Sequence, residues 1–291
     1  HYSFVNASWS FGYESGYQIP RPRYVDVMKS IATGTYYYVT KGEWGGSCYG
    51  MVATTLEFYE NWDYKVEDYD ESAQSLYDIA APQRKNAPLT KLIEAYQVSQ
   101  YTPGITACRG CVYKNMHNYK DLIRKVEEFE RSGGLGIDSQ AEPVIMVIFS
   151  AYSGHAVVPV SVDRDSAGDY VMKVYDPNSP GQLNTLKINR SLSGISYGMY
   201  TYASYVPYSL AANAMSGVQL HSDTKDDSLY LSIDKEKGRV TDAEGKGIEE
   251  IEGAYEQKPF NGAEEDAFSG IKSFVLPRGN YKLTAKDETE A

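Results

Sequence analysis

The chain has 291 residues, of which 42% are hydrophobic, so it is long enough for one large domain or two ordinary ones with a real core. Its net charge of -11 argues against nucleic-acid binding, because a nucleic-acid binder needs a basic face to displace counterions from phosphate. No apolar run reaches the ~18 residues that a membrane span needs, so we expect a soluble chain. No signal peptide is visible, and the start at His1 without a Met favours a mature form from which a targeting segment has been removed.

The first strong pattern follows a glycine-rich turn and begins at Cys48. One helical stripe and its neighbour are both apolar, which predicts a helix buried over much of its circumference; the two stripes are Met51, Thr55, Phe58 and Trp62, and Val52, Leu56 and Tyr59. Such a helix belongs in the middle of a domain. Its N-terminus carries a partial positive charge that would stabilise a thiolate at Cys48, and the thiolate is the reactive form of cysteine.

Other helices are expected on both sides of this one. A short helix is predicted around Tyr24–Ile31, and two more over Asp70–Ala80 and Leu89–Val98. A clearer helix has Asn118 as its candidate N-cap and ends at Gly133, and its apolar face contains Leu122, Ile123, Val126 and Phe129.

From residue 143 the pattern becomes extended. Strands are predicted over Val144–Phe149, Gly154–Val162 and Tyr170–Asp176, and the last two form a hairpin. If paired positions sum to about 331, His155 lies directly opposite Asp176. A slip of one residue would turn the two side chains to opposite faces, so the contact needs that register or a bulge.

Three short segments together resemble the papain-like cysteine peptidases. They are Gly46-Ser47-Cys48-Tyr49-Gly50, Gly154-His155-Ala156-Val157-Val158 and Val174-Tyr175-Asp176-Pro177-Asn178, in the order that this family requires. The resemblance implies an α+β fold over residues 1–208, with a helical half around the nucleophile helix and an antiparallel β half. It also implies hydrolysis of peptide or amide bonds through a thioester acyl-enzyme. Cys48 would be the nucleophile, His155 the base and acid, and Asp176 the residue that orients the imidazole.

One position departs from the family pattern. Papain-like enzymes typically carry a Gln oxyanion donor six residues before the Cys, where this chain has Gly42. The replacements considered, beside the Cys48 backbone N–H, are Lys41, Gln18, Asn6 and the Trp44 indole. The missing Gln keeps two alternatives open: a noncatalytic binding or adhesion protein, and an acyltransferase or cell-wall amidase with the same triad.

The other two cysteines form a C-x-x-C pair, Cys108 and Cys111. A short-loop disulfide in an exported protein would leave Cys48 as the free thiol. A thioredoxin-like redox pair is a weaker alternative, because the preceding segment does not read as a core strand. A zinc site with His117 lacks a fourth ligand, and two reduced thiols are the simplest alternative. We therefore expect no cofactor and no metal.

The last segment is interpreted as a separate module. Residues 215–291 alternate in short apolar strands between Gly and Pro turns, as expected of a small, possibly partial, β-sandwich of immunoglobulin-like type. The sequence thus predicts an exported bacterial enzyme, extracellular or at the cell surface. Its partner would be a protein or peptide substrate, and the module is a candidate contact to the cell surface or to glycans.

Overall fold

The computed structural model describes a chain that mixes α-helices with antiparallel β-sheet, which confirms the α+β class. The described residues are 19, 21–28, 47–61, 63–74, 76, 79, 88–102, 104–105, 118–133, 141–151, 153–179, 182–220, 229–234, 238–252, 254–257, 271–277 and 279–285. Contacts between Cα atoms divide the chain into two compact units. The first holds residues 1–18 and 43–218, and the second holds residues 19–42 and 219–291.

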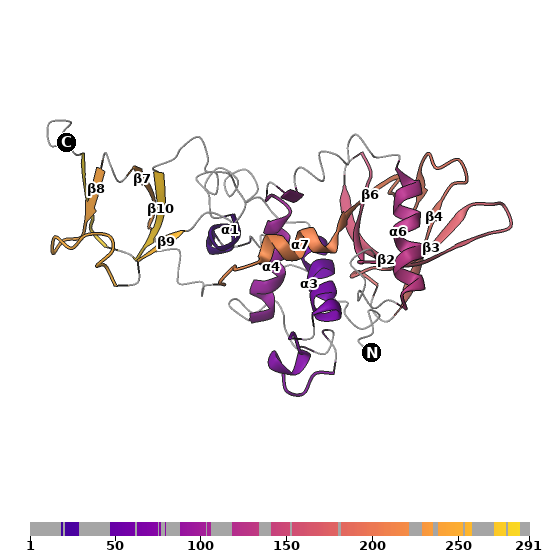
Figure 1. The fold of residues 1–291 in the computed structure, drawn as a ribbon, viewed down its shortest axis with the longest axis horizontal. Coiled ribbons are helices and arrows are strands. Elements are labelled where there is room, and N and C mark those ends of the chain that lie inside the picture. Colours follow the sequence, from indigo (N-terminus) through magenta and orange to yellow (C-terminus); the bar gives the residue numbers. More distant parts are fainter. Residues whose placement is uncertain are drawn as a thin grey trace. The chain divides into compact units, whose positions relative to one another are not determined.

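The first unit contains a six-stranded antiparallel sheet (Figure 1). Its strands are β1 (Val144–Phe149), β2 (Gly154–Arg164), β3 (Tyr170–Tyr175), β4 (Leu183–Ile188), β5 (Ile195–Ser196) and β6 (Tyr202–Pro207). They lie in the order β5-β4-β3-β2-β1-β6, so β2 is an interior strand with β1 on one side and β3 on the other. The three predicted strands are therefore confirmed, with small changes at their ends.

Helix α6 (Tyr119–Arg131) packs against this sheet, in contact with β2 and β6. Its predicted apolar residues, Leu122, Ile123, Val126 and Phe129, are all buried, and the first three share one core with the sheet. The helix ends near Gly133, whose φ of +75° suits a residue without a Cβ. Asn118 stands at the N-cap position as expected, but its side chain makes no capping hydrogen bond.

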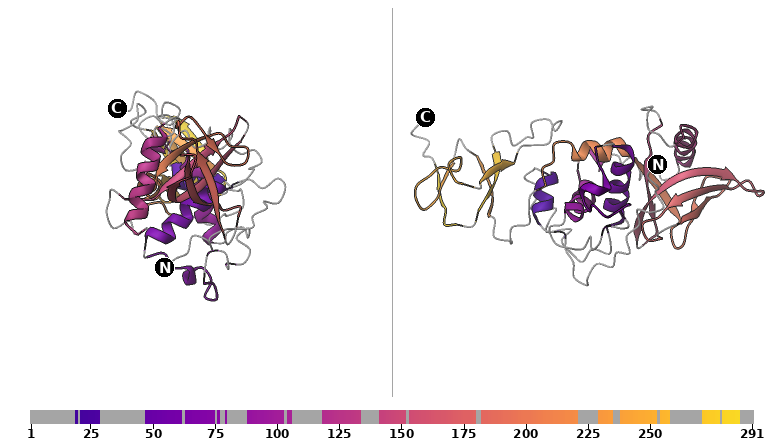
Figure 2. Two further views of the ribbon diagram at one scale, coloured as in Figure 1. Left: turned by 90° about the vertical axis from the view of Figure 1, so that its right-hand side faces the viewer. Right: turned by 90° about the horizontal axis from the view of Figure 1, so that it is seen from below.

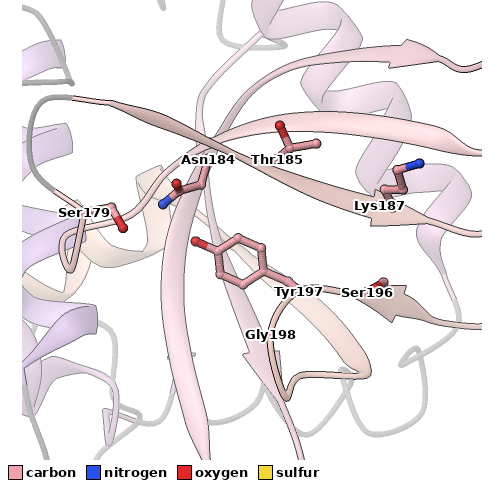
Figure 3. Close-up of a pocket in the computed structure, with 7 residues that line it drawn as sticks. All are labelled: Ser179, Asn184, Thr185, Lys187, Ser196, Tyr197 and Gly198. Atoms are coloured by element: carbon pink, nitrogen blue, oxygen red, sulfur yellow. The ribbon is translucent and has the colours of Figure 1, made fainter.

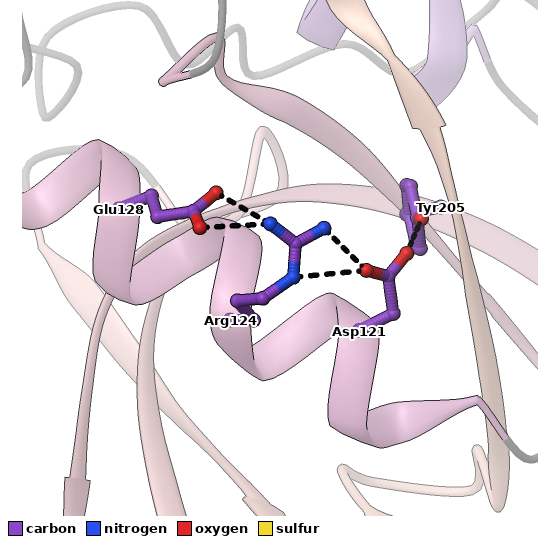
Figure 4. Close-up of polar contacts among 4 residues, drawn as sticks. All are labelled: Asp121, Arg124, Glu128 and Tyr205. Carbon is purple, nitrogen blue, oxygen red and sulfur yellow. Dashed lines mark hydrogen bonds and ion pairs between the residues drawn. The ribbon is translucent and has the colours of Figure 1, made fainter.

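A polar network joins the exposed side of α6 to β6 (Figure 4). The Arg124 guanidinium lies between two carboxylates, 2.6 Å from Asp121 and 2.7 Å from Glu128. The Tyr205 hydroxyl on β6 donates to the other oxygen of Asp121. Because Arg124 is exposed, this network contributes little to stability, and its main effect is to orient the helix on the strand.

Three further helices of the first unit lie side by side in Figure 1 and in the right-hand view of Figure 2: α3 (Cys48–Glu60), α4 (Pro88–Ser99) and α7 (Tyr208–Met215). Helix α3 starts at Cys48 as predicted, and every residue from Tyr49 to Phe58 is buried. It contacts β1 and β2 as well as α4 and α7, so it occupies the centre of this unit. The prediction of a buried, central helix that begins at Cys48 is confirmed, and the role of Cys48 as nucleophile stays a prediction.

A buried carboxylate ties these three helices together. Glu57 of α3 accepts hydrogen bonds from the hydroxyls of Tyr96 on α4 and Tyr208 on α7, and from the Asn61 amide at 2.8 Å. A buried carboxylate is tolerated only when such donors replace water. The network therefore joins α3 to both α4 and α7.

One predicted helix is absent where the structure describes it. Residues 70–74 of the expected Asp70–Ala80 helix form turns. The Asp70 carboxylate accepts hydrogen bonds from the backbone N–H of Ser72 at 2.9 Å and from its hydroxyl at 2.7 Å. This local turn competes with a helical backbone, so the apolar spacing alone was misleading here.

The register of the β2–β3 hairpin differs from the prediction. Paired positions sum to 334 near the hairpin loop and to 333 at the other end, with a bulge between Pro159 and Ser161. The direct opposition of His155 and Asp176 is therefore wrong. Continued by one residue, the pairing sets Asp176 opposite Val157, and Val157 lies on the same face of β2 as His155. The two side chains are thus diagonal neighbours on one face.

The second unit contains helix α1 (Arg21–Met28) and two small antiparallel sheets. One sheet has the order β7-β10-β9 and the other pairs β11 with β8; the strands are β7 (Leu229–Asp234), β8 (Gly238–Thr241), β9 (Tyr255–Gln257), β10 (Ile271–Leu276) and β11 (Lys282–Ala285). Val240, Ile251, Phe274 and Leu276 form its small core. The grouping of residues 19–42 with this unit was not anticipated from the sequence.

Candidate functional site

The start of β2 and the residue after β3 bring His155 and Asp176 together. Nε2 of His155 lies 2.8 Å from Oδ1 of Asp176, and both residues are only 5% exposed. Val158 and Tyr175 are the last paired residues on this side, so the two side chains meet where the ladder ends. The predicted contact is present, although it forms diagonally and not by direct opposition.

Cys48 completes this group from the first residue of α3. Its thiol is half-buried and outside any disulfide, and it lies close enough to the imidazole of His155 for its hydrogen bond and charge to be among the causes that raise the pKa of that histidine. Since Nε2 of the ring is held by Asp176, Nδ1 is the nitrogen that faces Cys48. The three predicted residues therefore form one chain of contacts, from Cys48 through His155 to Asp176.

The electrostatics of the group favour a charged histidine. Burial lowers the pKa of His155, but its hydrogen bonds with Asp176 and Cys48 and the charges of both groups outweigh it and raise the pKa to about 9. Burial likewise acts to raise the pKa of Asp176, but the hydrogen bond and charge of His155, with hydrogen bonds from Tyr197 and Asn178, bring that pKa below its usual value. At neutral pH the pair is an imidazolium and a carboxylate.

Two tyrosines that the sequence analysis did not identify support this pair. The Tyr197 hydroxyl donates a hydrogen bond of 2.5 Å to Oδ2 of Asp176. The Tyr200 ring stacks on the imidazole of His155, with ring centroids 5.9 Å apart and planes inclined by 23°. Both belong to one tight turn, closed by the backbone bond from Tyr200 N–H to the Tyr197 carbonyl at 2.9 Å. In a chain with 27 tyrosines, no pattern distinguished these two.

Asn178, the other candidate third member, has a different position. Its side chain is exposed, whereas its backbone N–H donates to Oδ1 of Asp176 at 2.8 Å. The backbone N–H of Ser179 also donates to the Asp176 carbonyl at 2.9 Å, which closes the turn. The turn after β3 therefore holds Asp176 through backbone N–H groups, and the Asn178 side chain is exposed.

The N-terminus of α3 is held by a residue of α4. The N–H of Gly50 donates to Oε1 of Gln97 at 2.8 Å, and Gln97 is buried. This bond satisfies one of the first-turn N–H groups that have no partner within a helix. A Cβ at Gly50 would lie 2.2 Å from the Ile93 carbonyl oxygen, so only glycine permits this close approach of the two helices.

Several predicted residues lie outside the described part of the chain. These are the oxyanion candidates Gln18, Lys41, Asn6 and Trp44, with Gly42, and the proposed disulfide partners Cys108 and Cys111 with His117. Within the described ranges, no group of three or more His, Cys, Asp or Glu residues is arranged to hold a metal ion. The same ranges contain no helix that is long and apolar enough to span a membrane.

Comparison of the chain with protein-family models, with curated proteins and with solved structures gave no match. Inference about function therefore rests on the residues of the site.

Proposed function

We propose that this chain is a papain-like cysteine peptidase in which Cys48 is the nucleophile, His155 the acid and base, and Asp176 the group that orients the imidazole. The observation that carries the proposal is the continuous contact from Cys48 through His155 to Asp176, in which Cys48 comes from a helix more than 100 positions before the hairpin that carries the other two residues. A lone cysteine at a helix N-terminus would not support this function. The presence of a cysteine, a histidine and an aspartate in one chain of contacts does support it.

The charges of the group suit this chemistry. A cation beside a cysteine and a helix N-terminus both favour the thiolate, which is the nucleophilic form. The raised pKa of His155, about 9, keeps the imidazolium present at neutral pH as the proton donor. Asp176, held by Tyr197 and by the Asn178 N–H, stabilises that cation and fixes its orientation.

The reaction then has two balanced halves. The Cys48 thiolate attacks the substrate carbonyl carbon, and collapse of the tetrahedral adduct breaks the C–N bond while His155 gives its proton to the departing amine. Water next attacks the thioester, with the neutral His155 accepting its proton, and the carboxylic product leaves as the thiolate re-forms. The Cys48 backbone N–H, at the start of α3, is the donor proposed for the oxyanion.

A labelling experiment tests this function without knowledge of the substrate. The full chain is incubated with an epoxide inactivator of papain-like enzymes and the adduct is mapped by mass spectrometry. We expect one adduct, on Cys48, and its loss in His155→Ala. The control is Tyr202→Phe, because Tyr202 lies on β6 with its side chain 40% exposed and is not one of the residues that hold Cys48, His155 or Asp176 in the contacts described above.

Two outcomes would contradict the proposal. An inert Cys48 in a folded protein would favour the noncatalytic binding or adhesion protein. Labelling at Cys48 together with transfer of the acyl group to an added amine, in place of hydrolysis, would favour the acyltransferase alternative. Product analysis with and without hydroxylamine as acceptor separates these two reactions.

A further inference from the structure

A polar pocket of about 530 Å³, largely open to solvent, has among its lining residues Tyr197, the tyrosine that holds Asp176 (Figure 3). Its lining residues carry hydroxyl, amide or ammonium groups, apart from one glycine: Ser179, Asn184, Thr185, Lys187, Ser196, Tyr197 and Gly198. The volume falls in the range of ordinary ligand pockets, but the lining lacks the aliphatic side chains that usually dominate them. A hydrophilic occupant is therefore favoured over an apolar one.

Tyr197 connects this pocket to the candidate site. Its hydroxyl is bonded to Asp176 and also interacts with the Asn184 amide, toward which it points in Figure 3. Ser179, another lining residue, belongs to the turn that begins at Asp176. The pocket thus begins where the Cys48–His155–Asp176 chain of contacts ends.

The direction of this chain decides which part of a substrate reaches the pocket. Cys48 faces one ring nitrogen of His155 and Asp176 the other, so Asp176 lies across the imidazole from the thiol. The acid must lie beside the amine that it protonates, which puts the leaving half of the substrate on the His155 side of Cys48. Along the chain of contacts that leads from Cys48 through His155, the next members are Asp176, Tyr197 and then the pocket that Tyr197 lines.

The edge of the sheet beside the pocket suits an extended chain. Strand β5 pairs with β4 only at Lys187 and Ile188. Along Leu183–Leu186, no strand among the described residues occupies that side of β4. An extended peptide can bond to such an edge through its backbone while its side chains enter neighbouring pockets.

The charges of the lining are balanced locally. Lys187 is the lining cation, and its ammonium is paired with Asp165 at 3.0 Å. Thr185 accepts a hydrogen bond from Lys173 at 3.0 Å. A cationic substrate side chain would meet Lys187 and Lys173, and an anionic one would compete with Asp165 for Lys187, so small neutral polar side chains fit best.

We propose that this pocket is the subsite for the leaving-group half of a peptide substrate, and that it selects an extended segment with small hydroxyl or amide side chains. The inference rests on the proposed function, because it takes its direction from the acyl-transfer chemistry of Cys48 and His155.

The test compares leaving groups on a constant acyl half, which is taken from the cleavage sites found in a proteome-derived peptide mixture. One internally quenched peptide continues with Gly-Ser-Asn, a second with Leu-Phe-Leu, and a third substrate carries only an aminomethylcoumarin amide. We expect kcat/KM for the polar peptide to exceed that for the apolar peptide by about tenfold. Thr185→Trp and Ser196→Trp, which each place an indole in the pocket and narrow it, should bring this ratio close to one.

The matched control is Thr284→Trp, an exposed strand threonine of the second unit, which should keep the wild-type ratio. Equal kcat/KM values for the two peptides in the wild type would overturn the proposed subsite. A polar-to-apolar ratio that is unchanged in both pocket variants would overturn it as well. In either case, turnover of the coumarin amide would show that the peptidase activity itself is present. If no substrate is cleaved and the inactivator does not label Cys48, the proposed function is wrong, and the subsite proposal, which depends on it, is wrong as well.

Discussion

The Tyr197 hydroxyl donates to Oδ2 of Asp176, while Oδ1 of the same carboxylate faces His155. Each carboxylate oxygen thus has its own partner, and rotation of the carboxylate would break both bonds. Burial, together with the neighbouring Asp176, raises the pKa of Tyr197, so its hydroxyl stays a donor throughout the physiological range. Tyr197 is therefore a positioning residue for the proposed catalysis.

Tyr197→Phe removes this donor and keeps the ring. We expect kcat for a peptide substrate to fall roughly tenfold, the size of an orienting hydrogen bond of ~1.4 kcal/mol, with little change in KM. The pKa of Asp176 should rise, because the Tyr197 bond is one of the causes that lower it. Activity at the acid end should then be lost at a higher pH than in the wild type. If Tyr197→Phe loses activity on the acid side at the same pH as the wild type, Tyr197 has a purely structural role.

Asp176 and Asn178 make contrasting predictions. Asp176→Ala should reduce kcat by on the order of 10²-fold or more, because the imidazole loses its orienting carboxylate. Asn178→Ala should have a far smaller effect, since its contribution to Asp176 is a backbone N–H that alanine retains. Equal losses in the two variants would contradict the assignment.

Asp176→Ala should also change the alkaline limb of the pH–activity profile. The proposed active form needs a protonated His155, so wild-type activity should fall as pH rises through about 9. Removal of the Asp176 hydrogen bond and charge takes away two causes that raise the pKa of His155, so the alkaline limb of Asp176→Ala should move to lower pH. Single-turnover rates measured across pH report this shift even where turnover is weak.

Gly50→Ala tests the close approach of α3 and α4. The new Cβ would lie 2.2 Å from a backbone oxygen that cannot rotate away, so the two helices must separate. We expect the free energy of unfolding to fall by about 1–3 kcal/mol or more, measured by denaturant titration. Gly104→Ala is the control, because nothing lies within 4 Å of its added Cβ. Unchanged stability in Gly50→Ala would show that α4 is not packed so closely.

Glu60, at the end of α3, predicts a pH dependence of stability. Burial, and then the charge of Glu142, raise its pKa to about 7, and its Oε1 is buried without a hydrogen-bond partner among the described residues. The unfolded chain ionises near the ordinary value, so the folded state binds the proton more tightly. Stability is present in full below about 4.5 and falls as pH rises towards about 7.

Glu60→Gln should abolish this decline. Denaturant titrations at pH 5 and pH 8 should show a smaller difference in unfolding free energy for the variant than for the wild type. Glu127→Gln, on the exposed face of α6, is the matched control and should behave as the wild type. If Glu60→Gln keeps the full pH dependence, another group is responsible for it.

The sequence by itself determined the residue types of the candidate site and the elements that carry them. Helix α3 begins at Cys48 and β2 at Gly154, next to His155, because apolar periodicity and the flanking turns are local properties of the chain. The same local reading failed at Asp70, where a side chain bonds to its own turn. The spacing of apolar residues indicates which positions are buried, but it does not indicate whether a side chain hydrogen-bonds to the backbone of a local turn.

Only the tertiary structure decided how His155 and Asp176 meet. With the pairing of the hairpin loop continued to the strand end, Asp176 would lie opposite Val158, on the other face from His155. The bulge between Pro159 and Ser161 shifts the pairing of β2 and β3 by one residue. This shift places Asp176 on the same face as His155. A bulge depends on the partner strand and on a proline that cannot donate to a ladder, so alternation along one strand cannot locate it. The supporting contacts of Tyr197, Tyr200, Gln97 and Glu57 likewise join residues distant in sequence, and their partners are fixed only when the sheet and helices pack.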